Sequence, residues 1–333
     1  MTPFTAPSPA RAFAGASVVV LGAAGFLGRW VARAMSIQGA RLTLVDRSRG
    51  ALESVLSEWE ARGEMVEADV TDAAALREVI ERAHPTTVFN LAGYGVSPSE
   101  RDEAIAARIN AELPEVLCDA VADAANSNGG VPARLVHVGS AYEYGAIGGD
   151  LAEDSEPNPV TLYGRTKLDG TRRLRARCEA RGVRGVTARL FMAYGPGEHP
   201  GRLFPSLIEA ARTGAPLDLT DGTQRRDFVW VEDVVQGLQR LALADAPPGA
   251  VVNLATGRLT TVRAFAETAA DILNLPLERL RFGALPSRPE EMAHDEVNVE
   301  RLRGLTGWVP ATSVDNGISR GVAFLRRTAS RSM

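Results

Sequence analysis

The feature that most constrains the fold is an alternation, from Ser17 onward, of short apolar runs with segments of helical periodicity. Each of these runs is rich in β-branched residues and is followed by a helical stretch or by a loop that leads to one. The runs are SVVVLG (17–22), RLTLVD (41–46), MVEADV (65–70), TVFNLA (87–92), RLVHVG (134–139) and GVTARL (185–190). Near-continuous apolar strands joined by helices are typical of a parallel sheet that is covered on both faces. The sequence therefore predicts an α/β protein with a doubly wound parallel sheet.

The alternation becomes less regular after about residue 190, where the Gly/Pro-rich segment YGPGEHPG interrupts it. The segments DFVWV and VVNLA beyond this point resemble strands that could return to the large sheet. We expect three parts, which are a disordered leader (1–14), a dinucleotide-binding domain (15–190) and a smaller substrate-binding α/β portion (191–330).

Composition excludes several classes of function. With 333 residues, of which 45% are hydrophobic and 23% charged, the chain can bury the full core of an ordinary globular protein. The net charge of −4 gives no electrostatic reason to expect nucleic acid or an anionic membrane as partner, and no apolar run reaches membrane-spanning length. The two cysteines, Cys118 and Cys178, lie well apart and show neither a disulfide framework nor metal-ligand spacing. We therefore expect a cytoplasmic protein without a bound metal.

Three glycines follow the first predicted strand. In VVVLGAAGFLGRW, Gly22, Gly25 and Gly28 lie between this strand and the helix that comes next. Glycine permits a tight turn and lets backbone N–H groups and the helix N-terminus approach a pyrophosphate. The position of the motif between a strand and a helix predicts the dinucleotide-binding loop of a Rossmann-type domain.

The end of the second predicted strand bears on which dinucleotide is bound. Asp46 has nearly the spacing of an acid that accepts hydrogen bonds from the adenosine ribose, and its charge disfavours a 2′-phosphate. Arg47 and Arg49 could accommodate that phosphate, or they could lie in a solvated loop. Asp69 could meet the adenine edge, or it could cap the helix that begins near Thr71. NAD is the predicted cofactor, with NADP as the alternative. The predicted cofactor-binding residues are Gly22, Gly25, Phe26, Leu27, Gly28, Asp46, Arg47, Asp69, Val70, Leu91, Ala92, Gly93, Tyr163 and Lys167.

A serine, a tyrosine and the single lysine of the chain form the predicted catalytic set. Tyr163 and Lys167 lie four residues apart in a segment that reads as helix over 162–181, so both project from one face. An adjacent ammonium, together with the nicotinamide cation, favours the phenolate and lowers the pKa of Tyr163 toward the working range. Lysine also offers three rotatable donors for the nicotinamide ribose. Ser140 ends the strand RLVHVGS, where its hydroxyl can polarise the substrate oxygen that exchanges a proton with Tyr163.

Further motifs occur in order along nearly the whole chain. They are GAAGFLG, NLAG, GSAYEYG, YGRTK, RLFMAYGPG, RRDFVWVEDV, RPEEM and GWVPATSVDNGI. Together they resemble the extended short-chain dehydrogenase/reductase family, specifically its nucleotide-sugar epimerases and dehydratases. The resemblance implies a Rossmann sheet that binds NAD(P) and a C-terminal domain that holds a nucleoside-diphosphate sugar. It assigns Ser140, Tyr163 and Lys167 to catalysis, and Arg226 and Arg288 to the substrate diphosphate, which guanidinium groups bind bidentately.

Departures from the family pattern narrow the expected chemistry. Family dehydratases have an Asp-Glu pair directly after the Ser/Thr, and decarboxylases have a glutamate at the second of these places, whereas this chain has Ala141 and Tyr142. Glu143 is displaced by one residue, which in an extended segment turns its side chain to the other face. Many epimerases bond the substrate with an asparagine where this chain has Met192. The predicted substrate-binding residues are Tyr94, Val96, Ser140, Ala141, Tyr142, Met192, Arg226 and Arg288.

The groups that remain are those needed to move a hydride and a proton at a carbinol carbon. We expect an NAD-dependent nucleotide-sugar epimerase that acts through a transient keto sugar. A nucleotide-sugar 4-ketoreductase is the alternative, because it uses the same groups and because GSAYEYG also resembles such enzymes. A non-catalytic dinucleotide sensor would be expected to lose Tyr163 or Lys167. A dehydrogenase of apolar alcohols would not need Arg226 and Arg288.

Family members often form homodimers by packing helices into a four-helix bundle. In this chain these would be the helix after Val96 and the helix that carries Tyr163. Apolar residues at helical spacing in the first of them fit such a dimer, and core packing explains them equally well. These residues are Ile105, Ile109, Leu113 and Leu117.

Overall fold

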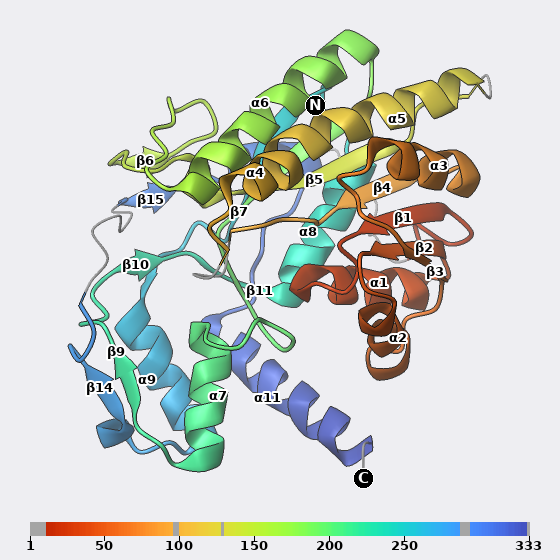
Figure 1. Cartoon of the computed structure of the whole chain (residues 1–333). Coiled ribbons are helices and arrows are strands. Elements are labelled where there is room, and N and C mark those ends of the chain that lie inside the picture. The colour runs from red at the N-terminus through yellow and green to blue at the C-terminus, as the bar shows by residue number, and fades with distance from the viewer. Residues whose placement is uncertain (1–10, 96–99, 128–129, 287–293, 332–333) are drawn as a thin grey trace.

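A seven-stranded parallel sheet forms the centre of the molecule (Figure 1). The computed structural model describes residues 11–95, 100–127, 130–286 and 294–331. The strand order is β12-β7-β5-β4-β1-β2-β3, and every neighbouring pair in this sheet is parallel. The predicted doubly wound α/β fold is confirmed. The strands are β1 (Ser17–Leu21), β2 (Arg41–Asp46), β3 (Glu64–Glu67), β4 (Thr87–Asn90), β5 (Arg134–Ser140), β7 (Gly185–Leu190) and β12 (Ala250–Leu254).

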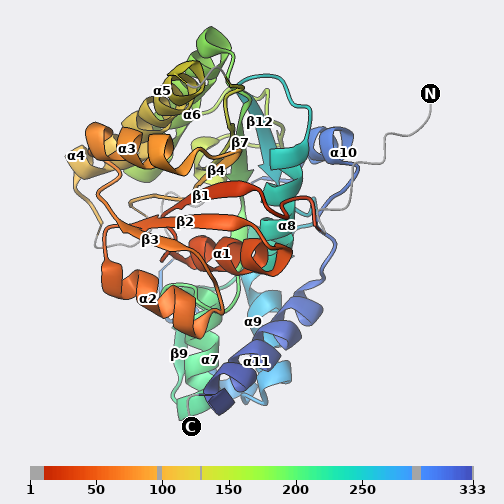
Figure 2. The same ribbon diagram turned by 90° about the vertical axis from the view of Figure 1, so that its right-hand side faces the viewer.

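Helices cover both faces of this sheet (Figure 2). Alternate residues of β1 point to opposite layers, so that Val18 and Val20 pack in one core cluster and Val19 and Leu21 in the other. This two-sided burial is the reason that the strands read as continuous apolar runs. The first layer holds α1 (Phe26–Gln38), α2 (Arg49–Glu58) and α8 (Val231–Leu243). The second holds α3 (Ala73–Ala83), α5 (Leu113–Ser127) and α6 (Leu162–Arg181), with α4 (Glu103–Ala106) and a π-helical segment (Ala107–Glu112) before α5.

Helix α6 occupies the residues that the sequence predicts. The Thr161 hydroxyl caps its N-terminus by accepting a hydrogen bond from the Gly164 N–H at 3.0 Å. Gly182 ends the helix in the left-handed conformation, with φ of +68°. Local capping signals therefore define both ends of the helix that carries Tyr163 and Lys167.

The chain beyond β7 forms a second lobe and also returns to the sheet. Helix α8 and strand β12 come from the predicted 191–330 portion, and β12 pairs with β7 at the sheet edge. The division at residue 190 stays a prediction. The other helices are α7 (Leu203–Thr213), α9 (Val262–Leu273), α10 (Glu300–Thr306) and α11 (Val314–Arg331), with 3₁₀ turns at Ala141–Glu143 and Leu277–Arg279. The short strands are β6 (Asp150–Leu151), β8 (Met192–Tyr194), β9 (Leu217–Leu219), β10 (Arg225–Arg226), β11 (Phe228–Trp230), β13 (Thr260–Thr261), β14 (Leu280–Phe282) and β15 (Glu296–Val297).

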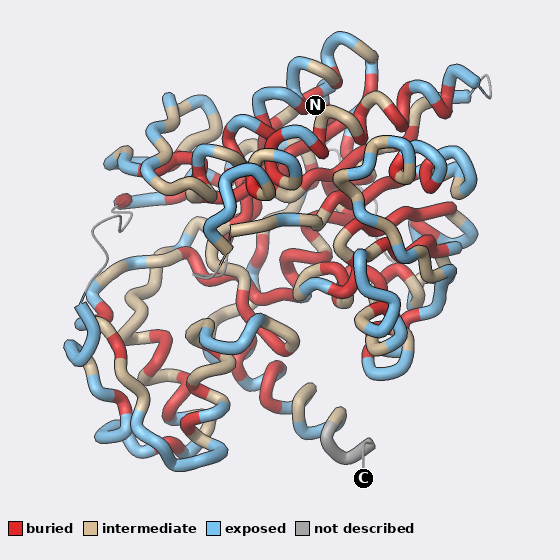
Figure 3. The backbone as a smooth tube through the Cα atoms, viewed as in Figure 1, coloured by how far each residue is buried: buried red, intermediate tan, exposed pale blue. Residues whose placement is uncertain are grey.

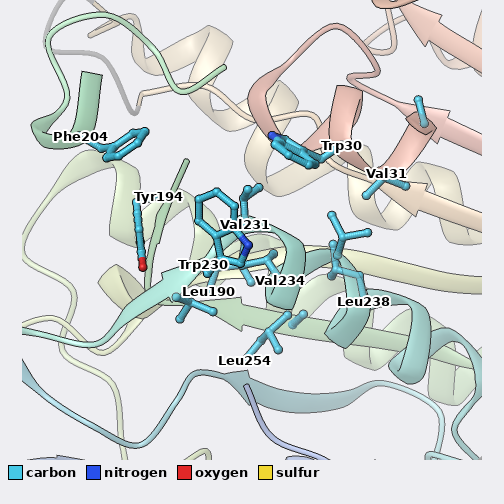
Figure 4. Close-up of a cluster of buried hydrophobic side chains, with 14 of the residues drawn as sticks. Trp30, Val31, Leu190, Tyr194, Phe204, Trp230, Val231, Val234, Leu238 and Leu254 are labelled. Atoms are coloured by element: carbon cyan, nitrogen blue, oxygen red, sulfur yellow. The ribbon is translucent and has the colours of Figure 1, made fainter. Parts of the chain in front are cut away.

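One hydrophobic cluster joins the sheet to the second lobe. Buried residues follow the strands and continue into the helices of that lobe (Figure 3). Trp30 from α1 packs against Trp230 with ring centroids 6.2 Å apart (Figure 4). The Trp30 indole N–H also donates a hydrogen bond to the Pro196 carbonyl at 2.8 Å. Burying this much aromatic surface in common fixes the two lobes against each other.

The packing of the chain corrects one expectation and brings together two residues that are distant in the sequence. The predicted disordered leader extends to residue 14, and residues 1–10 lie outside the described residues, but Phe13 is buried against Phe89 with ring centroids 6.4 Å apart. Cys118 and Cys178, which lie well apart in the sequence, meet on adjacent helices as buried free thiols with their sulfur atoms 3.7 Å apart. Both features come from tertiary contacts that local sequence cannot display. In the described part of the chain, no helix has the length and apolarity needed to cross a membrane.

Candidate functional site

The loop between β1 and α1 is shaped by its glycines. Gly22 has a φ of +73°, and a Cβ atom there would lie 2.9 Å from the backbone nitrogen of Ala92. A Cβ atom on Gly28 would overlap the carbonyl oxygen of Gly22. Gly25 is the N-cap of α1 and provides no side-chain hydrogen bond to the first turn. The loop thus presents a helix N-terminus that no capping side chain covers, which fits the pyrophosphate of a dinucleotide.

Asp46 lies against this loop. Its Oδ2 accepts a hydrogen bond from the backbone N–H of Ala24 at 3.1 Å, which holds the carboxylate beside the glycines. Arg29 lies on the same side, where its Nη2 donates to the Ala24 carbonyl at 2.5 Å and its guanidinium lies 5.3 Å from the Trp59 ring centroid. Burial lowers the pKa of Arg29, and the charges of Glu58 and Asp46 oppose this. No sequence pattern singled out Arg29, because one arginine in a chain rich in arginine does not stand out.

The carboxyl edge of the sheet gathers the predicted cofactor-binding residues. In open parallel sheets ligands bind at this edge. The residues come from the ends of four strands, with Gly22, Gly25, Phe26, Leu27 and Gly28 after β1, Asp46 and Arg47 at the end of β2, Asp69 and Val70 after β3, and Leu91, Ala92 and Gly93 after β4.

Asp69 stabilises a turn and does not cap α3. Its Oδ1 accepts hydrogen bonds from the Thr71 N–H at 2.9 Å and from the Thr71 hydroxyl at 2.8 Å. These bonds lower the pKa of Asp69. Asp72 caps α3 by accepting from two N–H groups of its first turn, so the helix begins two residues later than Thr71. The helix-cap alternative for Asp69 is therefore wrong.

We expect Asp46→Ala to reduce the preference for NAD over NADP by about tenfold or more, because charge-assisted hydrogen bonds to the ribose hydroxyls are lost. The measurement is the ratio of the dissociation constants of NADH and NADPH, determined by fluorescence after bound cofactor is removed. Asp72→Ala, which changes a carboxylate at the start of α3, is the matched control and should keep the wild-type ratio. An unchanged ratio in Asp46→Ala would contradict a role for this carboxylate in choosing the cofactor.

The predicted catalytic residues meet between β5 and α6. Ser140 is the last residue of β5, and its hydroxyl is hydrogen-bonded to that of Tyr163. Lys167 is only 2% exposed, and its Nζ donates a hydrogen bond to the Val138 carbonyl at 3.0 Å. The ammonium lies 6.0 Å from the centroid of the Tyr163 ring. A strand end and one helix face thus bring three polar groups together, as the spacing predicts.

The electrostatics of this set differ from the expectation in one respect. Burial raises the pKa of Tyr163 to about 12, and the hydrogen bond with Ser140 only partly opposes this rise. Burial also lowers the pKa of Lys167 to about 8. Desolvation is the largest influence on the pKa of Tyr163, and neither the Ser140 hydrogen bond nor the charge of Arg202 brings the phenol into the working range. The remaining lowering requires a further positive charge, which a nicotinamide ring supplies.

Asn110 is a buried residue of the site that sequence reasoning missed. It lies in the π-helical segment Ala107–Glu112 and is fully buried. Its side chain accepts from the Tyr94 N–H at 3.1 Å and donates to the Tyr94 carbonyl at 2.7 Å and to the Thr166 hydroxyl at 3.0 Å. The loop that follows β4 is thereby fixed to α6 between Tyr163 and Lys167. π-Helical turns often occur at functional sites, but no sequence pattern announced this one.

The residues predicted on the substrate side are partly brought together. The Tyr142 ring packs edge-on against the Tyr163 ring, with centroids 6.0 Å apart, and Ala141 is buried beside it. The Arg226 Nη1 donates to the carbonyl of Arg225 at 2.7 Å on β10. Val96 and Arg288 lie outside the described residues, so their roles in substrate binding stay predictions.

Met192 has an arginine as its neighbour where the family pattern has an asparagine. The Nη2 of Arg202 donates to the Met192 sulfur at 3.4 Å, and its Nε lies 3.3 Å from the Glu198 carboxylate. The charge of Arg202 opposes the rise in the pKa of Tyr163, so it acts on the predicted base. Burial raises the pKa of Glu198 to about 7. In the sequence this Gly/Pro-rich segment was interpreted only as an interruption of the α/β pattern, so the Arg202–Glu198 ion pair was missed.

Comparison with known proteins places these features among related chains. Residues 18–255 match the model of the NAD dependent epimerase/dehydratase family. The dTDP-6-deoxy-L-talose 4-dehydrogenase (NAD(P)(+)) of Kitasatospora kifunensis is 31% identical over 329 residues, which is 95% of each chain. A probable UDP-glucuronate 4-epimerase of Rhizobium meliloti (strain 1021) is 25% identical over 92% of this chain and 96% of its own. The solved structure of MoeE5 in complex with UDP-glucuronic acid and NAD is 28% identical, with a TM-score of 0.80 over 94% of this chain and 99% of that one.

Proposed function

The chain belongs to the NAD-dependent epimerase/dehydratase family, and on this premise we propose that it is an NAD-dependent nucleotide-sugar epimerase. The resemblance read from the sequence motifs is thereby confirmed, and so is NAD as the cofactor of the family. The close packing of the glycine loop and the Asp46 carboxylate held beside it support this cofactor.

One observation carries the choice of reaction within the family. The carboxylate nearest to Ser140 along the chain belongs to Glu143, and its side chain is fully buried. It accepts hydrogen bonds from the Ser140 N–H, from the Thr171 hydroxyl and from Arg189. It is therefore engaged away from the sugar, and Ala141 and Tyr142 offer no carboxylate in its place. The site therefore lacks the carboxylate that would act as acid or base in dehydration or decarboxylation. Hydride transfer needs only Ser140, Tyr163 and Lys167.

The proposed mechanism assigns one task to each of these groups. Bound NAD supplies reversible acceptance of a hydride at the carbinol carbon. The Tyr163 phenolate takes the hydroxyl proton, and the Ser140 hydroxyl donates a hydrogen bond to the resulting carbonyl oxygen. Lys167 holds the ribose next to the nicotinamide and contributes positive charge near the phenol. If the keto sugar turns within the site, and the hydride then returns to the opposite face of its carbonyl carbon while Tyr163 returns the proton to the oxygen, the product is the epimer and the cofactor is unchanged.

The proposed substrate is a nucleoside-diphosphate sugar. Arg226 supports this assignment, because a guanidinium group binds phosphate oxygens through paired hydrogen bonds. Relatives bear names that refer to nucleotide sugars, and a neighbouring structure contains UDP-glucuronic acid. The proposal for Arg288 rests on its sequence motif alone.

A 4-ketoreductase is the second candidate, favoured by one observation. The relative from Kitasatospora kifunensis carries a 4-dehydrogenase name and matches the chain over 95% of its length. The same three side chains serve both reactions, and the difference lies in whether reduced cofactor is consumed.

The deciding experiment uses a panel of UDP- and dTDP-sugars, including 4-keto sugars, with and without added NADH or NADPH. Product stereochemistry and nicotinamide absorbance are followed together. The epimerase assignment predicts interconversion of two C4 epimers with no net change in cofactor. Stoichiometric loss of reduced cofactor with a keto sugar, and no epimerisation, would replace it by the reductase assignment.

The proposal extends to assembly and location. Leu113 and Leu117 are buried within the chain, so a homodimer through α5 and α6 would use the outer faces of these helices. Two free thiols 3.7 Å apart support a reducing compartment such as the cytoplasm. Sedimentation or light scattering would test the dimer.

A further inference from the structure

A fully buried ion pair lies directly behind the predicted catalytic residues. Glu143 is the last residue of the 3₁₀ turn Ala141–Glu143, and its Oε2 lies 2.8 Å from the Nε of Arg189 on β7. The side chains are 0% and 5% exposed. The guanidinium also lies 4.5 Å from the Tyr144 ring centroid. Burying two charges costs free energy, so a pair of this kind calls for a reason beyond stability.

The carboxylate of Glu143 joins three elements of the site. Its Oε1 accepts from the backbone N–H of Ser140 at 2.8 Å, which fixes the end of β5. Its Oε2 accepts from the Thr171 hydroxyl at 3.0 Å, and Thr171 lies one turn after Lys167 on α6. Arg189 completes the set from β7. One side chain thus ties the strand end of Ser140 to the helix of Tyr163 and Lys167.

Within the part of the chain that the structure describes, Glu143 is the negatively charged group that acts on Lys167. The groups that face the ammonium are the Tyr163 ring on α6, the Val138 carbonyl and His137 on β5, and the backbone of Gly93 after β4. Burial lowers the pKa of His137 well below its usual value, so this imidazole is neutral over the working range. Burial also lowers the pKa of Lys167, and the charge of Glu143 is what raises it again.

We propose that Glu143 is a positioning residue of the site, which fixes Ser140 relative to α6 and supplies the buried negative charge that keeps Lys167 an ammonium. This deepens the proposed function, on which it rests only for the task of Lys167. Glu143, which stands one position after the carboxylates of family dehydratases, thus supports the catalytic residues without contacting the substrate. Arg189 and Thr171 hold its carboxylate in place through hydrogen bonds.

The single lysine of the chain allows a direct test. Because Lys167 is the single lysine of the chain, protein labelled with ¹³C and ¹⁵N in lysine gives one lysine side-chain signal. Lys167 can therefore be titrated by NMR without resonance assignment. In the wild type stripped of cofactor we expect a midpoint near the pKa of about 8. In Glu143→Gln the midpoint should fall, because the amide keeps the size of the side chain and removes its charge. Because the charge of Glu143 raises the pKa of Tyr163 as well as that of Lys167, its removal should shift both limbs of the pH–activity profile to lower pH.

Two further variants separate charge from shape. Glu143→Asp keeps the charge and should leave the midpoint close to the wild-type value. Asp233→Asn is the matched control, because this buried carboxylate binds Thr312 elsewhere in the fold and should not move the Lys167 signal. If Glu143→Gln does not fold with Arg189 left unpaired, the double variant Glu143→Gln, Arg189→Leu removes both charges and should also lower the midpoint.

An unchanged midpoint in Glu143→Gln, or in the double variant where that is used, overturns the proposal. An equal fall in Glu143→Asp also overturns it, because geometry and not charge would then be the cause. The titration needs no sugar substrate. A failure to find turnover with any nucleotide sugar would therefore count against the proposed function and leave this test intact.

Discussion

Tyr163→Phe is expected to lower kcat by about 10²- to 10⁴-fold, the range of a lost general acid–base group. The variant removes one oxygen atom and keeps the ring that packs against Tyr142 at 6.0 Å. Lys167 and the glycine loop are untouched, so the amount of NAD that copurifies should stay near the wild-type value. The measurements are kcat with the sugar found in the panel and the NAD content per chain after denaturation.

Tyr194→Phe is the matched control for this change. Tyr194 is a tyrosine of the buried core, and its hydroxyl contacts the Val314 carbonyl at 3.4 Å in the second lobe. Its kcat should stay within about twofold of the wild type, since a weak neutral hydrogen bond contributes little. Turnover that survives in Tyr163→Phe would show that another group moves the proton.

Lys167→Arg is expected to lower kcat by about 10²-fold or more and to weaken NAD binding, although the charge is kept. Lys167 is 2% exposed, and Gly93 would approach its Nζ to 3.5 Å if it carried a Cβ atom. The planar guanidinium is larger than the ammonium and cannot both donate to the Val138 carbonyl and avoid the Gly93 backbone. The measurements are kcat and the dissociation constant of NADH.

Arg172→Lys is the control in the opposite direction. Arg172 is exposed on α6, where its ion pair with Glu156 at 3.5 Å contributes little. Exchange of arginine and lysine there should leave kcat and NADH binding unchanged. Full activity in Lys167→Arg would mean that any cation satisfies this position, and the argument for lysine would be wrong.

The local part of the structure could be predicted because it depends on short spacings. The six apolar runs become six strands, since burial on both sides of a parallel sheet imposes an unbroken apolar pattern. The bounds of α6 follow from Thr161 and Gly182 at its ends. Gly22 and Gly28 are needed because no Cβ atom fits at either position. The third strand is the exception, for β3 ends at Glu67, three residues before the apolar run does.

The rest could not be predicted because it depends on contacts between distant parts of the chain. Asn110 meets Tyr94 and Thr166 only because a π-helical turn aims its side chain at both. Arg202 reaches Met192 through a glycine-rich turn whose path the sequence does not state. No periodicity within one segment contains this information.

The division between the two sources is clearest at the site itself. The sequence by itself singled out the side chains proposed to move the proton and the loop proposed to receive the dinucleotide, because strand ends and a four-residue helical spacing are local properties. The tertiary structure decided their charge states, since burial raises the pKa of Tyr163 and lowers that of Lys167. It also decided the task of Glu143, whose partners Thr171 and Arg189 are 28 and 46 residues away. Desolvation and long-range pairing exist only once the chain has folded, and that is why the sequence alone could not supply them.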